Sequence, residues 1–103
     1  MRVDHLTTLP PDWEAYSGVF NALGDPQRQK ILLLFERRER LTIKQIVDVF
    51  PGSRTATVHH LRVLEDAGIL RRQRVGKEVQ LWIDKKHLMS SIRRVSSFIF
   101  WRI

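Results

Sequence analysis

Histidine can bind a metal ion or act in catalysis, and two histidines stand side by side at positions 59 and 60. Neighbouring side chains on a helix point about 100° apart, so His59 and His60 cannot readily share one metal ion. The other histidines, His5 and His87, lie far away in the sequence. We therefore expect no metal site at this pair, and its role must follow from the helix that carries it.

The arrangements that indicate an enzyme are missing from the sequence. There is no Gly-rich phosphate loop, no serine with a credible histidine and acid partner, and no pair of carboxylates in an evident pocket. The chain has no cysteine, which excludes disulfides, thiolate metal sites and cysteine redox switches. We therefore expect neither an enzymatic activity nor a cofactor.

The histidine pair lies in a segment, residues 53–67, that has the pattern of an amphipathic helix. Ser53 is placed to cap its first turn, and Gly68 is placed to end it. One face is suited to packing and consists of Thr57, Leu61 and Leu64. The opposite face is polar and consists of Thr55, His59 and Arg62. A helix of this kind fits the DNA major groove, where side chains can contact base edges.

A basic hairpin is expected directly after this helix. Val79, Leu81 and Ile83 alternate with Gln80 and Trp82, which is the period of a strand with one buried face. Gly76 and Lys77 form a two-residue turn that joins this strand to another over about 69–75. The hairpin carries four cations within seven residues: Arg71, Arg72, Arg74 and Lys77. A ribbon with this charge suits phosphates or a minor groove.

Turn residues divide the rest of the chain into four further helices. The first is expected over about 12–23 and the second from 26 to about Glu39. The third begins behind a capping box formed by Thr42 and Gln45. The last is expected over 85–101, with Asp84 as its cap. The polar run 36–40 is expected to be the exposed end of the second helix. The predicted fold is mainly α with a small β-hairpin (α+β), in the order helix, helix, helix, helix, strand, strand, helix. Residues 1–103 form a single domain in this prediction.

The charge balance favours a polyanionic partner. Lys and Arg number 18 against 11 Asp and Glu, and the net charge is +7. No apolar run approaches the roughly 20 residues that a transmembrane helix needs. The first residues lack the apolar segment of a signal peptide. We therefore expect a cytoplasmic protein without a membrane partner.

Three segments together resemble the arsenic-repressor (ArsR) family of winged helix-turn-helix regulators. They are LGDPQRQKILLLF, SRTATVHHLRVLEDAGIL and RRQRVGKEVQLWI, and the resemblance covers about residues 19–83. It implies a homodimeric transcriptional regulator, usually a repressor, that binds a palindromic operator in double-stranded DNA. It also implies that the first and last helices form the dimer interface. Both ends of this chain carry apolar residues in excess of what a small monomer buries: Trp13, Tyr16, Phe20, Ile92, Val95, Ile99 and Trp101.

The chain departs from the metal-sensing members of that family. Those members carry Cys-x-Cys where this chain has Thr42 and Lys44, and a lysine would repel a cation. A second family site uses acidic and histidine ligands on the last helix, where this chain offers only Asp84 and His87. We expect no bound metal, and whether an organic effector exists stays open.

Each candidate DNA-contacting residue has an expected role. Arg54, His59 and Arg62 are candidates for base readout, and Ser53 and Thr55 for phosphate contacts. His60 is expected to be half-buried and to support the helix or touch a phosphate, while Val58 is either buried or in contact with a thymine methyl group. In the basic hairpin, which we call the wing, the candidates for phosphate contacts are Arg72, Arg74 and Lys77. Two alternatives remain: a winged helix that binds protein rather than DNA, and a DNA-binding protein without sequence preference.

Overall fold

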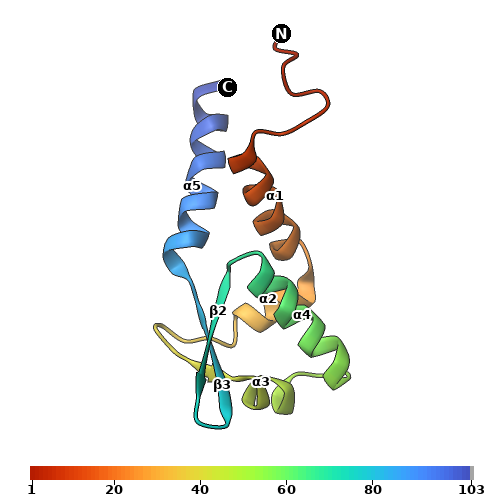
Figure 1. The fold of residues 1–103 in the computed structure, drawn as a ribbon, viewed down its shortest axis with the longest axis vertical. Coiled ribbons are helices and arrows are strands. Elements are labelled where there is room, and N and C mark those ends of the chain that lie inside the picture. The colour runs from red at the N-terminus through yellow and green to blue at the C-terminus, as the bar shows by residue number, and fades with distance from the viewer. Residues whose placement is uncertain (103) are drawn as a thin grey trace.

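The structure, a computed structural model, describes residues 1–102, which form five helices and three strands (Figure 1). The helices are α1 (Pro11–Leu23), α2 (Pro26–Leu32), α3 (Ile43–Val49), α4 (Arg54–Asp66) and α5 (Lys85–Arg102). The strands are β1 (Leu41–Thr42), β2 (Leu70–Val75) and β3 (Glu78–Ile83). The predicted mainly α fold with a hairpin is confirmed.

Local capping explains why most helices begin where the sequence predicts. The Asp25 side chain accepts hydrogen bonds from the backbone N–H groups of Gln27 and Arg28, and Pro26 occupies the first helical position of α2. Thr42 and Gln45 form the predicted capping box of α3. Ser53 caps α4, and Asp84 accepts from the backbone N–H of His87 at the start of α5.

The second helix is shorter than predicted. It ends at Leu32 rather than near Glu39, and Leu33, which was expected within it, is 83% exposed. The backbone N–H groups of Leu34 and Phe35 bond to carbonyls three residues back, so the last turn tightens and the chain leaves the helix. Residues 36–40 are therefore a loop and not a helix end.

The loop leads into a strand that the sequence analysis did not predict. β1 pairs antiparallel with β3, with Leu41 opposite Leu81 and Thr42 opposite Gln80. The sheet therefore has three strands in the order β1-β3-β2. This pairing requires an extended chain at Leu41.

The core lies where α4 crosses the other elements. Its fully buried apolar residues come from α1 to α4, from the turn after α4 and from the hairpin: Val19, Ala22, Ile31, Ile46, Leu61, Leu64, Ile69, Leu70 and Leu81. Helix α5 contributes the buried Ser91. Gly68 closes the turn between α4 and β2 with a φ of +77°, a conformation that favours glycine. A Cβ atom at this position would also lie 2.8 Å from the His87 ring. Both the backbone conformation and the close approach of His87 therefore favour glycine here.

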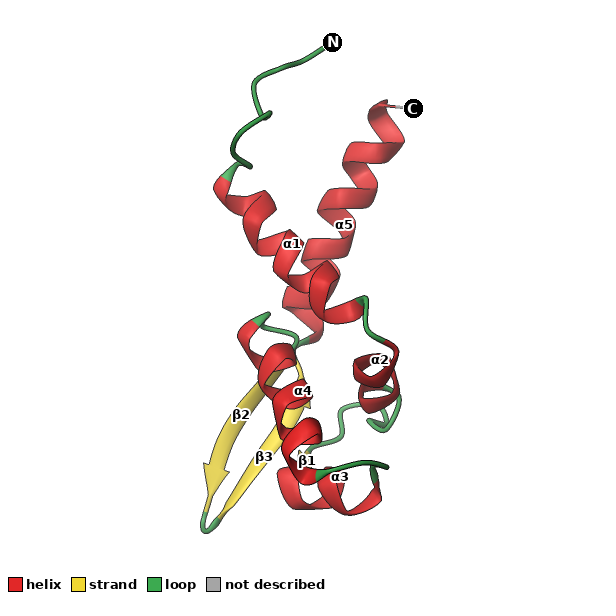
Figure 2. Cartoon of the chain, turned by 90° about the vertical axis from the view of Figure 1, so that its right-hand side faces the viewer, coloured by secondary structure: helices red, strands yellow, loops and turns green. Residues whose placement is uncertain are grey.

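The molecule is elongated, with extents of 52 × 26 × 22 Å. Helices α1 and α5 project together from one end, and the β2–β3 turn lies at the other end, beside α3 (Figures 1 and 2). No helix within residues 1–102 combines the length and apolar character needed to cross a lipid bilayer. The two projecting helices are thus separated from the wing along the long axis.

Candidate nucleic-acid interface

Helix α4 has two unlike faces. Thr57, Leu61 and Leu64 are buried, as predicted, and the Thr57 hydroxyl donates to the Ser53 carbonyl at 3.1 Å. The opposite face is exposed to solvent and consists of Thr55, His59 and Arg62. The buried row fixes the helix against the core, so the polar row is presented in a constant orientation.

The first turn of α4 adds exposed polar groups beside this face. Ser53 and Arg54 are exposed, and Ser53 Oγ accepts from the Ala56 N–H at 3.1 Å. The Ser53 hydroxyl hydrogen is not used by that bond and is available to an acceptor such as a phosphate. Val58 is half-buried at the margin, so both roles predicted for it remain open.

The histidine pair does not form a metal site in this geometry. The rings of His59 and His60 are 5.9 Å apart between centroids, with the His59 side chain exposed and that of His60 half-buried. Among residues 1–102, no three His, Asp or Glu side chains are grouped so that they could hold a metal ion. The Nε2 atom of His87 lies 3.1 Å from the Ala67 carbonyl oxygen, so this ring packs under the turn that follows α4.

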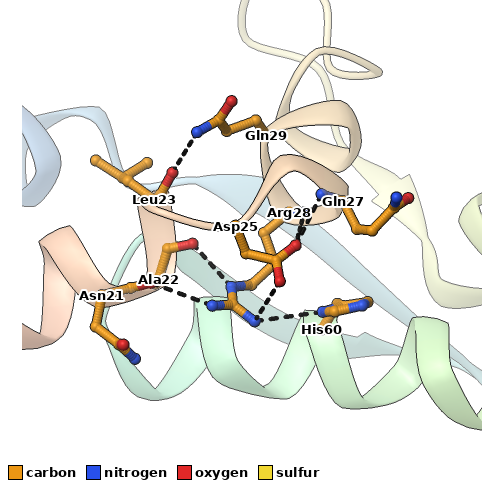
Figure 3. A network of polar contacts seen from close by, with 8 residues as sticks. All are labelled: Asn21, Ala22, Leu23, Asp25, Gln27, Arg28, Gln29 and His60. Carbon is orange, nitrogen blue, oxygen red and sulfur yellow. Dashed lines mark hydrogen bonds and ion pairs between the residues drawn. The ribbon is translucent and has the colours of Figure 1, made fainter.

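His60 belongs to a polar network that connects three helices (Figure 3). The Arg28 guanidinium donates to the carbonyls of Ala22 at 2.8 Å and Asn21 at 3.1 Å, at the end of α1. Its Nη1 lies 3.4 Å from His60 Nδ1. Arg28 thereby connects α1 and α2 to the underside of α4.

The cap of α2 shares this network. Desolvation raises the pKa of the Asp25 carboxyl, but the N–H groups of Arg28 and Gln27 and the charge of Arg28 outweigh it and hold that pKa below 3.8. Asp25 also lies 3.8 Å from Arg28 Nη1. Arg28 was not among the predicted site residues, although it lies in the segment LGDPQRQKILLLF.

The cations of the wing are not equivalent. Arg72 forms a bidentate ion pair with Glu65 of α4, with Nη2 at 2.9 Å from Oε2, so this predicted phosphate contact is already paired. Arg71 pairs with Asp84 at 3.2 Å. Arg74 and Lys77 are exposed, and neither forms an ion pair within residues 1–102. These two are therefore the wing cations most available to an anion.

A hollow of about 370 Å³ flanks α4 on the side of α2 and is lined by Gln27, Lys30 and Ala56, among others. Lys30 is exposed and forms no ion pair within the described residues. A recognition helix in a major groove has phosphate backbones on both of its flanks. Lys30 is thus a further candidate for a phosphate contact, which the sequence analysis missed because it lies on another helix.

The residues predicted to form a dimer interface divide between two surfaces. Trp13 and Tyr16 of α1 face α5 of the same chain: the Trp13 and Phe98 rings are 5.2 Å apart, and Arg94 Nε donates to the Tyr16 hydroxyl at 3.3 Å. Trp101 lines a hollow on this same side, between α1 and α5, whereas Ile92, Val95 and Ile99 lie on another side of α5. Phe20 of α1 is 42% exposed. Ile92, Val95 and Ile99 share a side of α5 about 100° from Arg94 and Phe98.

Comparisons with known proteins identify the family. Residues 23–73 match the model of a helix-turn-helix domain. Over 83 residues the chain is 31% identical to the transcriptional repressor SdpR of Bacillus subtilis, which covers 81% of this chain and 91% of SdpR. An ArsR-like transcriptional regulator from Rhodococcus sp. RHA1 has the same fold, with a TM-score of 0.74, 26% identity and 87% of each chain covered. The chain belongs to the ArsR family of winged helix-turn-helix transcriptional regulators.

The proteins that the chain matches are named as transcriptional repressors or regulators. The chain is also 29% identical, over 76 residues that make up 74% of it, to a homolog of the cadmium resistance transcriptional regulatory protein CadC from Staphylococcus aureus. The match spans 63% of that relative, less than two thirds of its length.

Proposed function

We propose that this ArsR-family protein is a homodimeric repressor that binds a palindromic operator through α4 and the wing. The observation that carries the proposal is the polarity of α4, whose buried row of Thr57, Leu61 and Leu64 lies opposite a solvent-exposed polar row. A polar, basic helix face held in one orientation is the feature that reads base edges in a major groove.

The residues take different roles in this proposal. Arg54, His59 and Arg62 contact base edges, and Ser53 and Thr55 contact phosphates at the start of α4. His60 orients the helix through Arg28 rather than by contact with a base. Arg74 and Lys77 supply the phosphate contacts of the wing, and Arg72 contributes to them only when its pair with Glu65 opens.

The dimer is supported by the apolar surface of the projecting helices. Ile99 and Trp101 are 47% and 79% exposed, and Phe20 is 42% exposed. Apolar groups at this density cost free energy in water unless another surface covers them. A second copy that packs against Ile92, Val95 and Ile99 covers the side of α5 that its own α1 leaves open. Two-fold symmetry of the protein then matches a palindromic operator.

Regulation of this protein does not use a cysteine metal site in our proposal. The two positions that would need metal ligands are Thr42 and Lys44. Thr42 serves as the cap of α3, and the ammonium of Lys44 lies 2.6 Å from Asp48. Neither side chain is a ligand that Zn²⁺ prefers.

The proposal is tested by selecting bound fragments from a random pool of DNA duplexes. We expect enrichment of a palindrome whose half-sites lie about one helical turn, or a multiple of it, apart. The enriched site should keep its advantage over random DNA as salt is raised, because non-specific binding is mainly phosphate electrostatics. Equal binding of all sequences would contradict operator recognition, and absence of binding to any duplex at low salt would contradict DNA reading altogether.

A further inference from the structure

A cleft of about 560 Å³ lies between the 36–40 loop, the end of β3 and the start of α5. Its apolar lining is provided by Phe35, Trp82 and Ile83, all half-buried. The volume falls within the range of about 300–1,000 Å³ that small-molecule sites occupy. None of the residues assigned to DNA contact or to the dimer lines this cleft.

The cleft lies on the face of the sheet opposite α4. Arg72 and its cross-strand partner Leu81 face α4, as the pair between Arg72 and Glu65 shows. Side chains alternate along a strand, so Trp82 and Gln73 point to the other face. A molecule bound over Trp82 therefore does not compete with DNA for α4.

Arg40 is held in the cleft by two uncharged partners. Its guanidinium carbon lies 4.0 Å from the centre of the Trp82 ring, and its Nη1 donates to Gln73 Oε1 at 2.6 Å. Arg40 forms no ion pair within residues 1–102. A guanidinium has five N–H donors in a fixed plane, so donors remain that could bind a carboxylate.

The other charged groups of the cleft leave it with an excess of positive charge. Arg37, Arg38 and Lys85 line it without an ion pair in the described residues, while the carboxylates are those of Glu36 and Glu39. One oxygen of Glu39 accepts from the Glu36 N–H at 3.2 Å. Arg38 has a φ of +60°, an unfavourable conformation for a residue with a side chain. The turn thus gathers cations beside an aromatic surface.

We propose that this cleft binds a small organic carboxylate with a flat ring. The carboxylate accepts hydrogen bonds from Arg40, which covers a face of Trp82, and the ring lies beside Arg40 against Phe35 and Ile83. The site connects the wing, through Trp82, to the start of α5, through Lys85. The inference does not depend on the proposed operator or dimer, because binding is measured on the protein without DNA.

The test is a titration of ¹⁵N-labelled protein, followed by its amide NMR signals, with benzoate and indole-3-acetate as probes. Indole-3-acetamide supplies the ring without the charge, acetate the charge without the ring, and inorganic phosphate a different anion. We expect saturable shifts from at least one aromatic carboxylate, grouped on residues 35–40 and 82–85, and affinity about tenfold weaker for the controls. Arg40→Gln should weaken binding about tenfold, whereas Arg93→Gln, an equal charge change on α5 outside the cleft, should leave it unchanged.

Any one of the following results would overturn the proposal. The first is that neither carboxylate saturates at millimolar concentration. The second is that the amide or phosphate binds as well as the carboxylates. The third is that the shifts fall on α1 and the end of α5, or that Arg40→Gln binds like the unmodified protein. Since Arg40 is exposed, its replacement should leave the fold intact, which the dispersion of the same NMR spectra checks.

Discussion

The Arg28 guanidinium lies 3.4 Å from His60 Nδ1 and connects the start of α2 to the middle of α4 (Figure 3). The same guanidinium donates hydrogen bonds to two backbone carbonyls at the end of α1, and the Arg28 side chain is only 12% exposed. The helix that carries the proposed base contacts is therefore oriented by a residue that itself contacts no base.

Arg28→Ala should lower the free energy of unfolding by about 2–4 kcal/mol, because it leaves partly buried acceptors without their charged donor. Urea denaturation checks this value. Arg62→Ala, on the exposed face of α4, is the matched control and should change stability by no more than about 0.5 kcal/mol. Equal effects of the two substitutions would contradict the orienting role of Arg28.

Asp25 should make stability depend on pH in the acid range. Its pKa in the folded chain lies below its ordinary value of 3.8, so its contribution is complete above pH 3.8 and is lost as the pH falls through the folded-state pKa. Asp25→Asn should lower Tm at neutral pH, with a difference that shrinks below pH 3.8. Asp66→Asn, at an exposed position that caps no helix, should show no such convergence in a series of thermal melts.

Local sequence signals predicted most of the fold. Pro26, the capping box at Thr42 and Gln45, and the turn at Gly76 act within a few residues, and each begins or ends the element that it marks. The end of α2 was not predictable in this way, because nothing in LLLFERRER breaks a helix locally. The strand that follows was not predictable either, because Leu41 pairs with Leu81, a partner far along the chain.

The candidate site shows the same division. The alternation of buried and exposed residues on α4 follows from helical spacing, so the exposure of His59 and the half-burial of His60 were foreseen. The contacts of Arg28 with His60 and of Arg72 with Glu65 join different elements, 32 and 7 residues apart. Composition and period carry no information about such pairs, because they depend on how the elements dock.

The pair of Arg72 and Glu65 should restrain the binding of DNA by the wing. Glu65→Gln releases the Arg72 charge, so we expect tighter binding to random DNA and a salt dependence steeper by about one counterion. Asp66→Asn removes the same charge from the same helix without releasing an arginine. If both variants changed the salt slope equally, the pair would have no specific role. Fluorescence anisotropy over a salt series provides the measurement.

Arg54 and Arg74 should differ in what they contribute to DNA binding. Arg54→Ala should relax the preference at one base position of the selected operator, at a cost of about 1–3 kcal/mol. Arg74→Ala should weaken binding to all DNA sequences about equally and lower the slope of affinity against salt concentration by about one. Binding of each variant to the operator and to random DNA separates the two effects, and identical behaviour would show that the assigned roles are wrong.

Ile99 tests the dimer, because it is 47% exposed on the side of α5 that the chain's own α1 leaves uncovered. Ile99→Glu places a charge where the partner's apolar surface should lie, so we expect the dissociation constant of the dimer to rise about 100-fold or more. Sedimentation equilibrium measures this change. Ser90→Glu introduces the same charge at an exposed position on a different side of α5 and should leave the assembly intact. Because Ile99 is outside the core of the protomer, the monomer should retain its helical circular dichroism and bind a single half-site weakly. A dimer that survives Ile99→Glu unchanged would place the interface on another surface.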